Sequence, residues 1–235
     1  GFGVLDEFLF KKKASKTFIL VDENTAACIG EFSNQLVHLD ADFDVLEVPS
    51  GEESKSIEVV VQLWASLLEY GADRDALLIN LGGGMICDLG AFVASTYKRG
   101  ISYVQVPTSL LAMVDASIGG KTGINYKNLK NNLGTFSNPK SIFCDHHFLA
   151  TLSKKEKISG MAEVFKHAII GDHQLWKHLA NQNIDSLDYE YLIPRSSNLK
   201  LKVVKADPLE EGERKKLNPE TSRDSNCWIR TRVIF

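Results

Sequence analysis

Residues 77–88 read LLINLGGGMICD, and this stretch decides the fold. Its first five residues form a short apolar run that is typical of a buried β-strand. Three glycines follow, and residues 85–97 can form a helix directly after them. A strand, a glycine turn and a helix N-terminus together offer backbone N–H groups and the positive end of a helix dipole. The stretch therefore predicts an α/β fold in which Gly82–Gly84 bind a phosphate or pyrophosphate.

Two glycine loops in the chain differ from the common nucleotide-binding fingerprints. The pattern GxGxxG counted from Gly82 needs glycine at position 87, where Cys87 stands. The segment DASIGGKT at 115–122 resembles a triphosphate-binding loop, but Asp115 occupies the place of its first glycine. A tight structural turn is the alternative to anion binding at the first loop.

Outward from residues 77–88, short apolar runs alternate with segments of helical period. Ile57, Val60, Trp64 and Leu67 give one apolar stripe on a helix that ends near Gly71. This alternation favours parallel strands joined by helical crossovers. We expect five strands, at Thr17–Val21, Phe43–Val48, Leu77–Leu81, Tyr103–Val106 and Ser141–Cys144.

A second, helical domain is predicted after residue 150. Strand signals fade beyond Leu152, and the remaining segments have helical character. The predicted helices are Ser153–Gly171, His173–Asn181 and Ser186–Ala206. We divide the chain into an α/β domain at 1–150, the start of a helical domain at 151–218, and an unrelated tail at 219–235.

Composition excludes several classes of function. The chain has 235 residues, 44% hydrophobic and 24% charged, with a net charge of −3. The acidic balance argues against nucleic acid as a partner, and no apolar run is long enough to span a membrane. The four cysteines show no paired spacing, so we expect reduced thiols and a cytoplasmic protein.

One helical segment, GMAEVFKHA at 160–168, places three ionisable side chains on adjoining parts of a face. Glu163 and His167, four residues apart, are able to contact one metal ion. Glu163 and Lys166 are equally able to pair as surface charges, and spacing alone favours this salt bridge.

The order of these segments resembles the 3-dehydroquinate synthase family and its sugar-phosphate cyclase relatives. The resemblance runs from the first residues to Asn218. It implies a Rossmann-like N-terminal domain followed by an incomplete all-helical C-terminal domain. The matching segments are DEN at 22–24, GEESK at 51–55, GGGMICD at 82–88, TYKRG at 96–100, PTSLLAMVD at 107–115, GGKTG at 119–123, KN at 130–131 and GMAE at 160–163.

The resemblance also implies site residues. Residues matching cofactor contacts are Asp22, Asn24, Glu52, Lys55, Gly83, Gly84, Met85, Asp88, Thr108, Ser109, Lys121, Lys130, Phe148 and Thr151. Residues matching contacts to the substrate's hydroxyls, carboxylate and phosphate are Asp115, Lys121, Asn131, Lys166, Lys200, Arg214 and Asn218. Arg99 matches a residue that reaches across a dimer interface, and Glu163 matches the first of three metal ligands.

The implied activity depends on NAD and a divalent metal, zinc or cobalt, in a homodimer that takes a sugar acid phosphate. It converts 3-deoxy-D-arabino-heptulosonate 7-phosphate to 3-dehydroquinate and phosphate, a step of the shikimate pathway. Alternatives are another cyclase such as 2-deoxy-scyllo-inosose synthase, a metal-dependent alcohol or glycerol dehydrogenase, and a non-catalytic NAD-binding or dimerisation remnant.

The family pattern is interrupted after Asn218. The family continues with two histidine ligands, whereas here Pro219 follows and all six histidines lie at or before His178. We therefore expect a truncated or frameshifted chain whose metal site is reduced to Glu163. Alone, it is predicted to bind NAD weakly and to be inactive.

Overall fold

The computed structural model describes residues 2–39, 42–127, 129–183 and 186–212. Its main sheet has four strands, all parallel to their neighbours, in the order β2-β1-β3-β4. This confirms the predicted α/β class and four of the five predicted strands. The strands are β1 (Thr17–Asp22), β2 (Asp44–Val48), β3 (Leu77–Gly82) and β4 (Ser102–Pro107).

The prediction of a fifth strand at 141–144 was wrong. This segment runs beside β4 and makes one isolated parallel bridge, between Gln105 and Ile142. Gln105 N donates to Ser141 O at 3.1 Å, and Phe143 N donates to Gln105 O at 2.8 Å. An apolar run indicates that a segment is buried, but a β-strand also needs a continuous ladder of hydrogen bonds to its neighbour. The chain instead turns at Asp145, which caps the short helix η5 (His146–Ala150) by accepting from His147 N.

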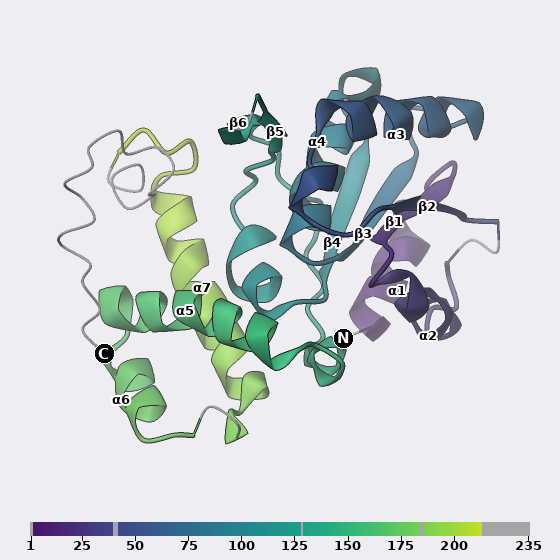
Figure 1. Ribbon diagram of the computed structural model, residues 1–235. Helices are drawn as coiled ribbons and strands as arrows, with labels where there is room; N and C mark the ends of the chain where they lie inside the picture. The colour runs from purple at the N-terminus through teal and green to yellow at the C-terminus, as the bar shows by residue number, and fades with distance from the viewer. Residues whose placement is uncertain (1, 40–41, 128, 184–185, 213–235) are drawn as a thin grey trace.

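Helices cover both faces of the sheet, as Figure 1 shows. On one face, α3 (Ile57–Glu69) and α4 (Gly84–Thr96) pack over Phe18, Leu20 and Leu78. On the other, α1 (Phe2–Lys12) and α2 (Ile29–Asn34) pack over Ile19, Val21 and Ile79. Successive side chains of a strand point to opposite faces, so burial on both sides explains the unbroken apolar runs of β1 and β3.

A second group of helices contains α5 (Lys154–Gly171), α6 (His173–Ala180) and α7 (Tyr189–Ala206). Each begins at a polar cap, Ser153, Asp172 or Asp188, whose side chain accepts a backbone N–H of the first turn. No helix in the described part of the chain combines the length and apolarity needed to cross a bilayer. The three predicted helices are therefore present, with the last starting three residues later than expected.

The segment after β4 joins the two parts of the structure. Leu110, Met113 and Val114 are buried in one cluster with apolar residues of α5, α6 and α7. Residues 112–116 form a turn of π-helix, η4, a rare conformation that is frequent at functional sites. The helical core thus includes residues well before 150, and the domain boundary near 150 stays a prediction.

Sequence patterns did not indicate the antiparallel pair β5 (Ile124–Tyr126) and β6 (Leu129–Leu133). All five β6 side chains are exposed, so no apolar alternation marks this strand. The remaining short helices are η1 (Ala26–Cys28), η2 (Glu52–Ser54) and η3 (Tyr97–Arg99).

The strand order identifies the edge of the sheet where a ligand is expected. The chain moves from β1 to β2 on one side, and then from β3 to β4 on the other. The direction therefore reverses between β1 and β3, whose carboxyl ends are Asp22 and Gly82. Open parallel sheets bind ligands outside the carboxyl ends of their strands at such a reversal. The fold thus places the glycine loop at the expected ligand edge.

Candidate functional site

The glycine loop connects β3 to α4 and exposes the start of that helix. Gly83 is the N-cap of α4 and supplies no side-chain cap. Its φ of −72° and ψ of −171° suit any residue, so backbone conformation alone does not require glycine there. A side chain at Gly82 would instead meet Ile86 Cβ at 2.6 Å. Bare N–H groups and the helix dipole at this uncapped end fit a phosphate group.

Residues predicted to contact the cofactor surround this loop from neighbouring strand ends. Thr108 N, just past β4, donates to Gly82 O at 2.9 Å. Asp22 ends β1, and its carboxylate accepts from Thr25 N and Thr25 Oγ1, both at 2.9 Å. Asn24 and Glu52 are exposed in the segments that follow β1 and β2. The sheet thus brings three separate sequence motifs to one edge.

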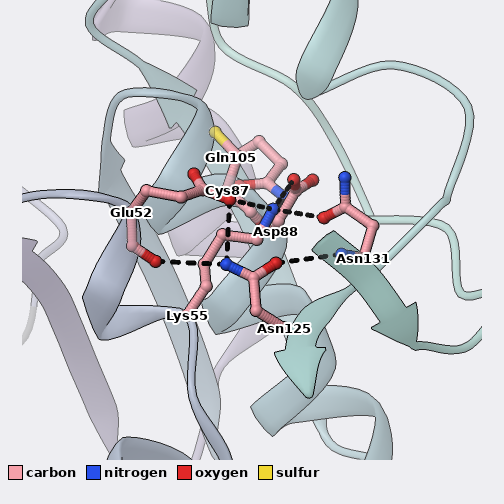
Figure 2. A network of polar contacts seen from close by, with 7 residues as sticks. All are labelled: Glu52, Lys55, Cys87, Asp88, Gln105, Asn125 and Asn131. Carbon is pink, nitrogen blue, oxygen red and sulfur yellow. Dashed lines mark hydrogen bonds and ion pairs between the residues drawn. The ribbon is translucent and has the colours of Figure 1, made fainter. Parts of the chain in front are cut away.

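Lys55 is the centre of the polar network in Figure 2. Only 3% of its surface is exposed. Its Nζ donates to Asp88 Oδ2 at 2.8 Å and to Asn131 Oδ1 at 2.5 Å, and Glu52 Oε1 lies 3.7 Å away. A buried ammonium group is tolerated only with such partners. The network joins η2, α4 and β6, and it fixes the position of Asp88 near the glycine loop.

Asn125 is part of this network and was missed by sequence reasoning. Its Nδ2 donates to Glu52 Oε1 at 3.0 Å, and its Oδ1 accepts from Asn131 N at 2.9 Å. Asn125 N also donates to Lys55 O at 2.7 Å. The β5–β6 pair is therefore tied to the segment after β2 (Figure 2). No local signal predicts this contact, because Asn125 and Glu52 are 73 residues apart in sequence.

A second cluster of ionisable groups forms where η4, α5 and α7 meet. Lys200 Nζ lies 2.5 Å from Asp115 Oδ1, and Lys166 Nζ lies 2.5 Å from Glu163 Oε2. The latter contact confirms the salt bridge that spacing favoured. His167 Nε2 lies 4.0 Å from the same Glu163 oxygen. Four residues predicted for substrate or metal are thus brought together, with His167 beside them.

Burial and charge set the protonation of this cluster. Burial opposes ionisation of Asp115, but Lys200 outweighs it and holds the pKa of that carboxyl below its usual value. For His167, burial is the largest effect and lowers the pKa, although Asp115 and Glu163 oppose it. The imidazole is therefore neutral at pH 7. Its Nδ1 forms a 2.7 Å hydrogen bond with the fully buried Ser196 Oγ.

The cluster also has the donor set of a divalent metal site. Asp115, Glu163 and His167 each offer a ligand atom, and these atoms lie within 4.8 Å of one another. Two carboxylates and a neutral imidazole suit zinc or cobalt. A second such group, Asp145 with His146 and His147, lies on η5 and its cap. The first group fits the metal expected at Glu163.

Four other predicted residues are in neither the Lys55 network nor the cluster of η4, α5 and α7. Arg99 is exposed just after α4. It precedes the start of β4, whereas the glycine loop follows the carboxyl end of β3. Lys121 Nζ pairs with Glu210 Oε1 at 3.0 Å, and Lys130 is exposed on β6. Thr151 is exposed after η5.

The remaining predicted residues fall into three groups. Phe148 is half-buried, with its ring edge-on to Phe2 at 5.9 Å. Met85, Gly84 and Ser109 lie at the glycine loop or beside it, and their contact with a cofactor stays a prediction. Arg214 and Asn218 lie outside the described residues, as does the predicted tail.

The cysteines agree with the expectation of free thiols where the structure describes them. Cys28, Cys87 and Cys144 are free, and Cys227 lies outside the described residues. Burial raises the pKa of Cys144 to about 11 and that of Cys87 well above its usual value. Both thiols stay protonated at neutral pH, which makes them poor nucleophiles.

Comparison with known proteins supports the resemblance. The chain matches the family described as 3-dehydroquinate synthase N-terminal over residues 45–159, and the one described as 3-dehydroquinate synthase C-terminal over residues 160–219. It is 41% identical over 218 residues to a 3-dehydroquinate synthase of Parabacteroides distasonis, covering 91% of this chain and 61% of that protein. A Campylobacter concisus 3-dehydroquinate synthase is 46% identical over 174 residues, covering 74% and 50%.

Solved structures show the same fold. The 2-epi-5-epi-valiolone synthase ValA of Streptomyces hygroscopicus subsp. jinggangensis 5008, solved with NAD+ and Zn2+, has a TM-score of 0.73 at 27% identity, covering 85% of this chain and 58% of that one. A 2-deoxy-scyllo-inosose synthase has a TM-score of 0.78 at 21% identity, covering 91% and 61%. The chain spans about 60% of the length of the curated 3-dehydroquinate synthases that match it over most of its own length. Together with the two sequence matches, the shared fold shows that this chain belongs to the 3-dehydroquinate synthase family.

Proposed function

We propose that this chain provides the NAD-binding part and the first part of the metal and substrate site of a 3-dehydroquinate synthase. The enzyme converts 3-deoxy-D-arabino-heptulosonate 7-phosphate to 3-dehydroquinate and phosphate. The observation that carries the proposal is the fold's placement of the glycine loop at the reversal between β1 and β3, with Asp115 on η4 shortly after β4. The family membership and the 41% identity to a curated synthase support the specific reaction.

The glycine loop is proposed to hold the cofactor's pyrophosphate. Gly83, Gly84 and Met85 present the start of α4, while Asp22 and Asn24 contact the adenosine ribose. The other proposed cofactor contacts are Glu52, Lys55, Asp88, Thr108, Ser109, Lys121, Lys130, Phe148 and Thr151. NAD would accept a hydride from the ring carbon that bears a hydroxyl and would later return it. The cofactor is therefore unchanged at the end of the catalytic cycle. The relative ValA, 27% identical, was solved with NAD+.

The substrate is proposed to lie between the glycine loop and the cluster on α5 and α7. Lys166 and Lys200 carry positive charge beside Asp115, which suits a phosphate and a carboxylate. A divalent metal at Glu163 supplies Lewis acidity, which lowers the pKa of a bound alcohol. Asp115 and Asn131 orient the hydroxyls. The further proposed substrate contacts are Lys121, Arg214 and Asn218.

We further propose a cytoplasmic homodimer, in which Arg99 serves the partner's site. Its exposure at the edge opposite the glycine loop agrees with a role outside its own site. The proposed domain division is 1–150 for NAD and 151–218 for metal and substrate. Sedimentation with and without Arg99→Ala tests the dimer.

The decisive experiment measures NAD binding by calorimetry in the unchanged chain and in Gly83→Ala. A Cβ at Gly83 has room, with Ser109 Oγ at 3.6 Å, and the backbone suits alanine. The variant should keep its melting temperature, whereas the methyl group obstructs the exposed N–H groups. We expect NAD affinity to fall on the order of tenfold, or about 1.4 kcal/mol. Equal affinity in both proteins would contradict binding at this loop.

Substrate class is tested by adding ligands to the NAD-bound chain. 3-Deoxy-D-arabino-heptulosonate 7-phosphate should bind more tightly than glucose 6-phosphate, which lacks the carboxylate. The reverse order would favour a cyclase acting on a sugar phosphate that has no carboxylate. Assays of released phosphate and of NADH absorbance then separate the activities. A cyclase releases phosphate without accumulating NADH, a dehydrogenase accumulates NADH, and the non-catalytic remnant does neither.

A further inference from the structure

The glycine loop is anchored on both sides by β4 and the residue that follows it. Before the loop, Thr108 N donates to Gly82 O at 2.9 Å. After the loop, Gln105 Nε2 donates to Cys87 O at 3.0 Å, as Figure 2 shows. Residues 83–86, which are the N-cap and the first helical residues of α4, therefore lie between two hydrogen bonds from one strand and its end.

The backbone of Gln105 is fixed on both sides. On one side, Gln105 lies opposite Asn80 in the pairing of β3 with β4. On the other, its N donates to Ser141 O at 3.1 Å, and its O accepts from Phe143 N at 2.8 Å. Only 3% of the residue is exposed. The side-chain amide therefore extends from a rigid strand and fixes the position of Cys87 O.

A glutamine is not the most stabilising residue for this position. Its Oε1 is buried and accepts no hydrogen bond in the described part of the chain, and the same holds for the side-chain amide of Asn80 beside it. Both side chains face α4, on the side of the sheet whose core includes Leu20 and Leu78. Burial of an unpaired amide oxygen costs free energy, which a methionine of similar size avoids. Stability alone therefore gives no reason for a glutamine here.

We infer that Gln105 is a positioning residue for the cofactor's pyrophosphate. This inference rests on the proposed function, which puts the pyrophosphate at the glycine loop. By holding Cys87 O in the first turn of α4, Gln105 keeps the N–H groups of residues 84–86 in the arrangement that the anion requires. Donors that are already oriented lose less conformational entropy when the ligand binds, so this restraint adds to affinity. Gln105 acts through α4 rather than by contact with the anion.

The test measures NAD affinity by calorimetry in Gln105→Met, with the melting temperature as a second measurement. Methionine fills a similar space but has no donor for Cys87 O. We expect NAD affinity to fall about fivefold to tenfold, as for the loss of one hydrogen bond. The melting temperature should change little, because the substitution also removes the unpaired Oε1. A glutamine that served only the fold would lower stability and leave the affinity of the folded chain unchanged.

A second variant, Gln105→Glu, gives a pH-dependent signature. A protonated carboxyl group has nearly the shape of the amide and donates its O–H to Cys87 O, whereas an ionised carboxylate only accepts. Burial raises the pKa of a glutamic acid, to about 8–9 at fully buried positions. We therefore expect this variant to bind NAD almost as the unchanged chain does near about pH 6, and more weakly as the pH rises to about 9.

The unchanged chain is measured at each pH, so the ratio of the two affinities is the quantity compared. Burial raises the pKa of Cys87 and of Tyr103, the other ionisable groups on this side of β4, so neither thiol nor phenol ionises at neutral pH. An affinity ratio that stays constant with pH would overturn the proposal. If Gln105→Met does not fold, this pH profile decides the question.

Gln62→Met is the matched control, because it makes the same change at an exposed position of α3. Its NAD affinity should equal that of the unchanged chain. Unchanged affinity in Gln105→Met, with the loss of affinity expected for Gly83→Ala, would reject the role of Gln105 alone. Unchanged affinity in Gly83→Ala would reject NAD binding at the loop, and the role of Gln105 with it.

Discussion

Lys55 lies almost entirely out of water, with Asp88 and Asn131 as hydrogen-bond partners from distant parts of the chain. Lys55→Met keeps most of the side-chain volume but removes the charge, so it leaves the Asp88 carboxylate without its ammonium partner. We expect weaker NAD binding and faster amide exchange in β5 and β6. Calorimetry and hydrogen exchange measure these effects.

The control for this prediction is Lys140→Met, since Lys140 is exposed. That variant should match the unchanged chain in both measurements. Equal exchange in Lys55→Met and Lys140→Met would show that the network does not hold the β5–β6 pair in place.

Gly160 is required for the close approach of α5 to the segment after β4. A Cβ there would lie 2.7 Å from both Leu110 Cβ and Leu111 N. Alanine favours a helix by about 1 kcal/mol relative to glycine. Overpacking against a buried backbone costs roughly 1–3 kcal/mol, so we expect Gly160→Ala to be destabilising on balance. Thermal unfolding measures the change.

Gly30 is the matched control, because it also lies in a helix but has no atom within 4 Å of the position that an added Cβ would take. Gly30→Ala should leave the melting temperature equal or higher. A stabilised Gly160→Ala would mean that α5 and Leu110 are not packed as described.

At the scale of elements, Asp172 connects α6 to α7. Its Oδ1 accepts from Gln174 N at 3.0 Å and Leu175 N at 2.9 Å, which caps α6. Arg195 Nε lies 2.5 Å from Oδ2, and this hydrogen bond is the main reason that the pKa of Asp172 is lowered to about 2. The Asp172 carboxylate thus caps the start of α6 and forms an ion pair with Arg195 of α7.

Two variants separate these roles. Asp172→Ala loses the cap, worth about 1 kcal/mol, and the partly exposed ion pair, worth roughly 0.2–1 kcal/mol. Asp172→Asn keeps a cap acceptor and loses only the charge. We therefore expect the alanine variant to be less stable than the asparagine variant at pH 7, as measured by urea unfolding.

The pH dependence of this pair has a defined sign. The pKa of Asp172 is lower in the folded chain than its usual 3.8, so the pair stabilises the fold fully above pH 3.8. That contribution is lost as pH falls from 3.8 to about 2. The stability difference between the unchanged chain and Asp172→Asn should shrink over this interval. A constant difference would exclude the ion pair as its source.

At the scale of the whole molecule, Phe148 contacts the cores of both parts. It packs against the cluster beneath α1 and α2 and against the cluster of α5, α6 and α7. Phe148→Ala should therefore weaken the connection between the sheet and the helices. Truncation of a fully buried phenylalanine costs roughly 3–5 kcal/mol, and we expect about 2 kcal/mol for this half-buried ring.

Calorimetry measures this effect, with Phe136→Ala as the control. Phe136 is 52% exposed, so its truncation should change stability little. We expect a broadened or split transition for Phe148→Ala only. A single sharp transition at an unchanged temperature would show that Phe148 does not join the two cores.

The sequence by itself determined the α/β class, four strands, the helices α3 to α7 and the family. These follow from local information, because apolar periodicity and glycine position report burial and turns within a few residues. The glycine loop and the Glu163–Lys166 pair were predictable for the same reason. The apolar run at 141–144 led to a wrong strand prediction, because burial of apolar residues does not by itself produce a ladder of hydrogen bonds between strands.

Only the tertiary structure decided which distant residues meet. The strand order that puts Asp22 beside Gly82, the attachment of Asn125 to Glu52, and the meeting of Asp115 with Glu163 and His167 all join residues far apart in sequence. Such contacts result from packing of whole elements, which local propensity does not encode. His167 shows the difference most clearly. Its spacing from Glu163 was visible in the sequence, whereas its hydrogen bond to Ser196 and its proximity to Asp115 required the fold.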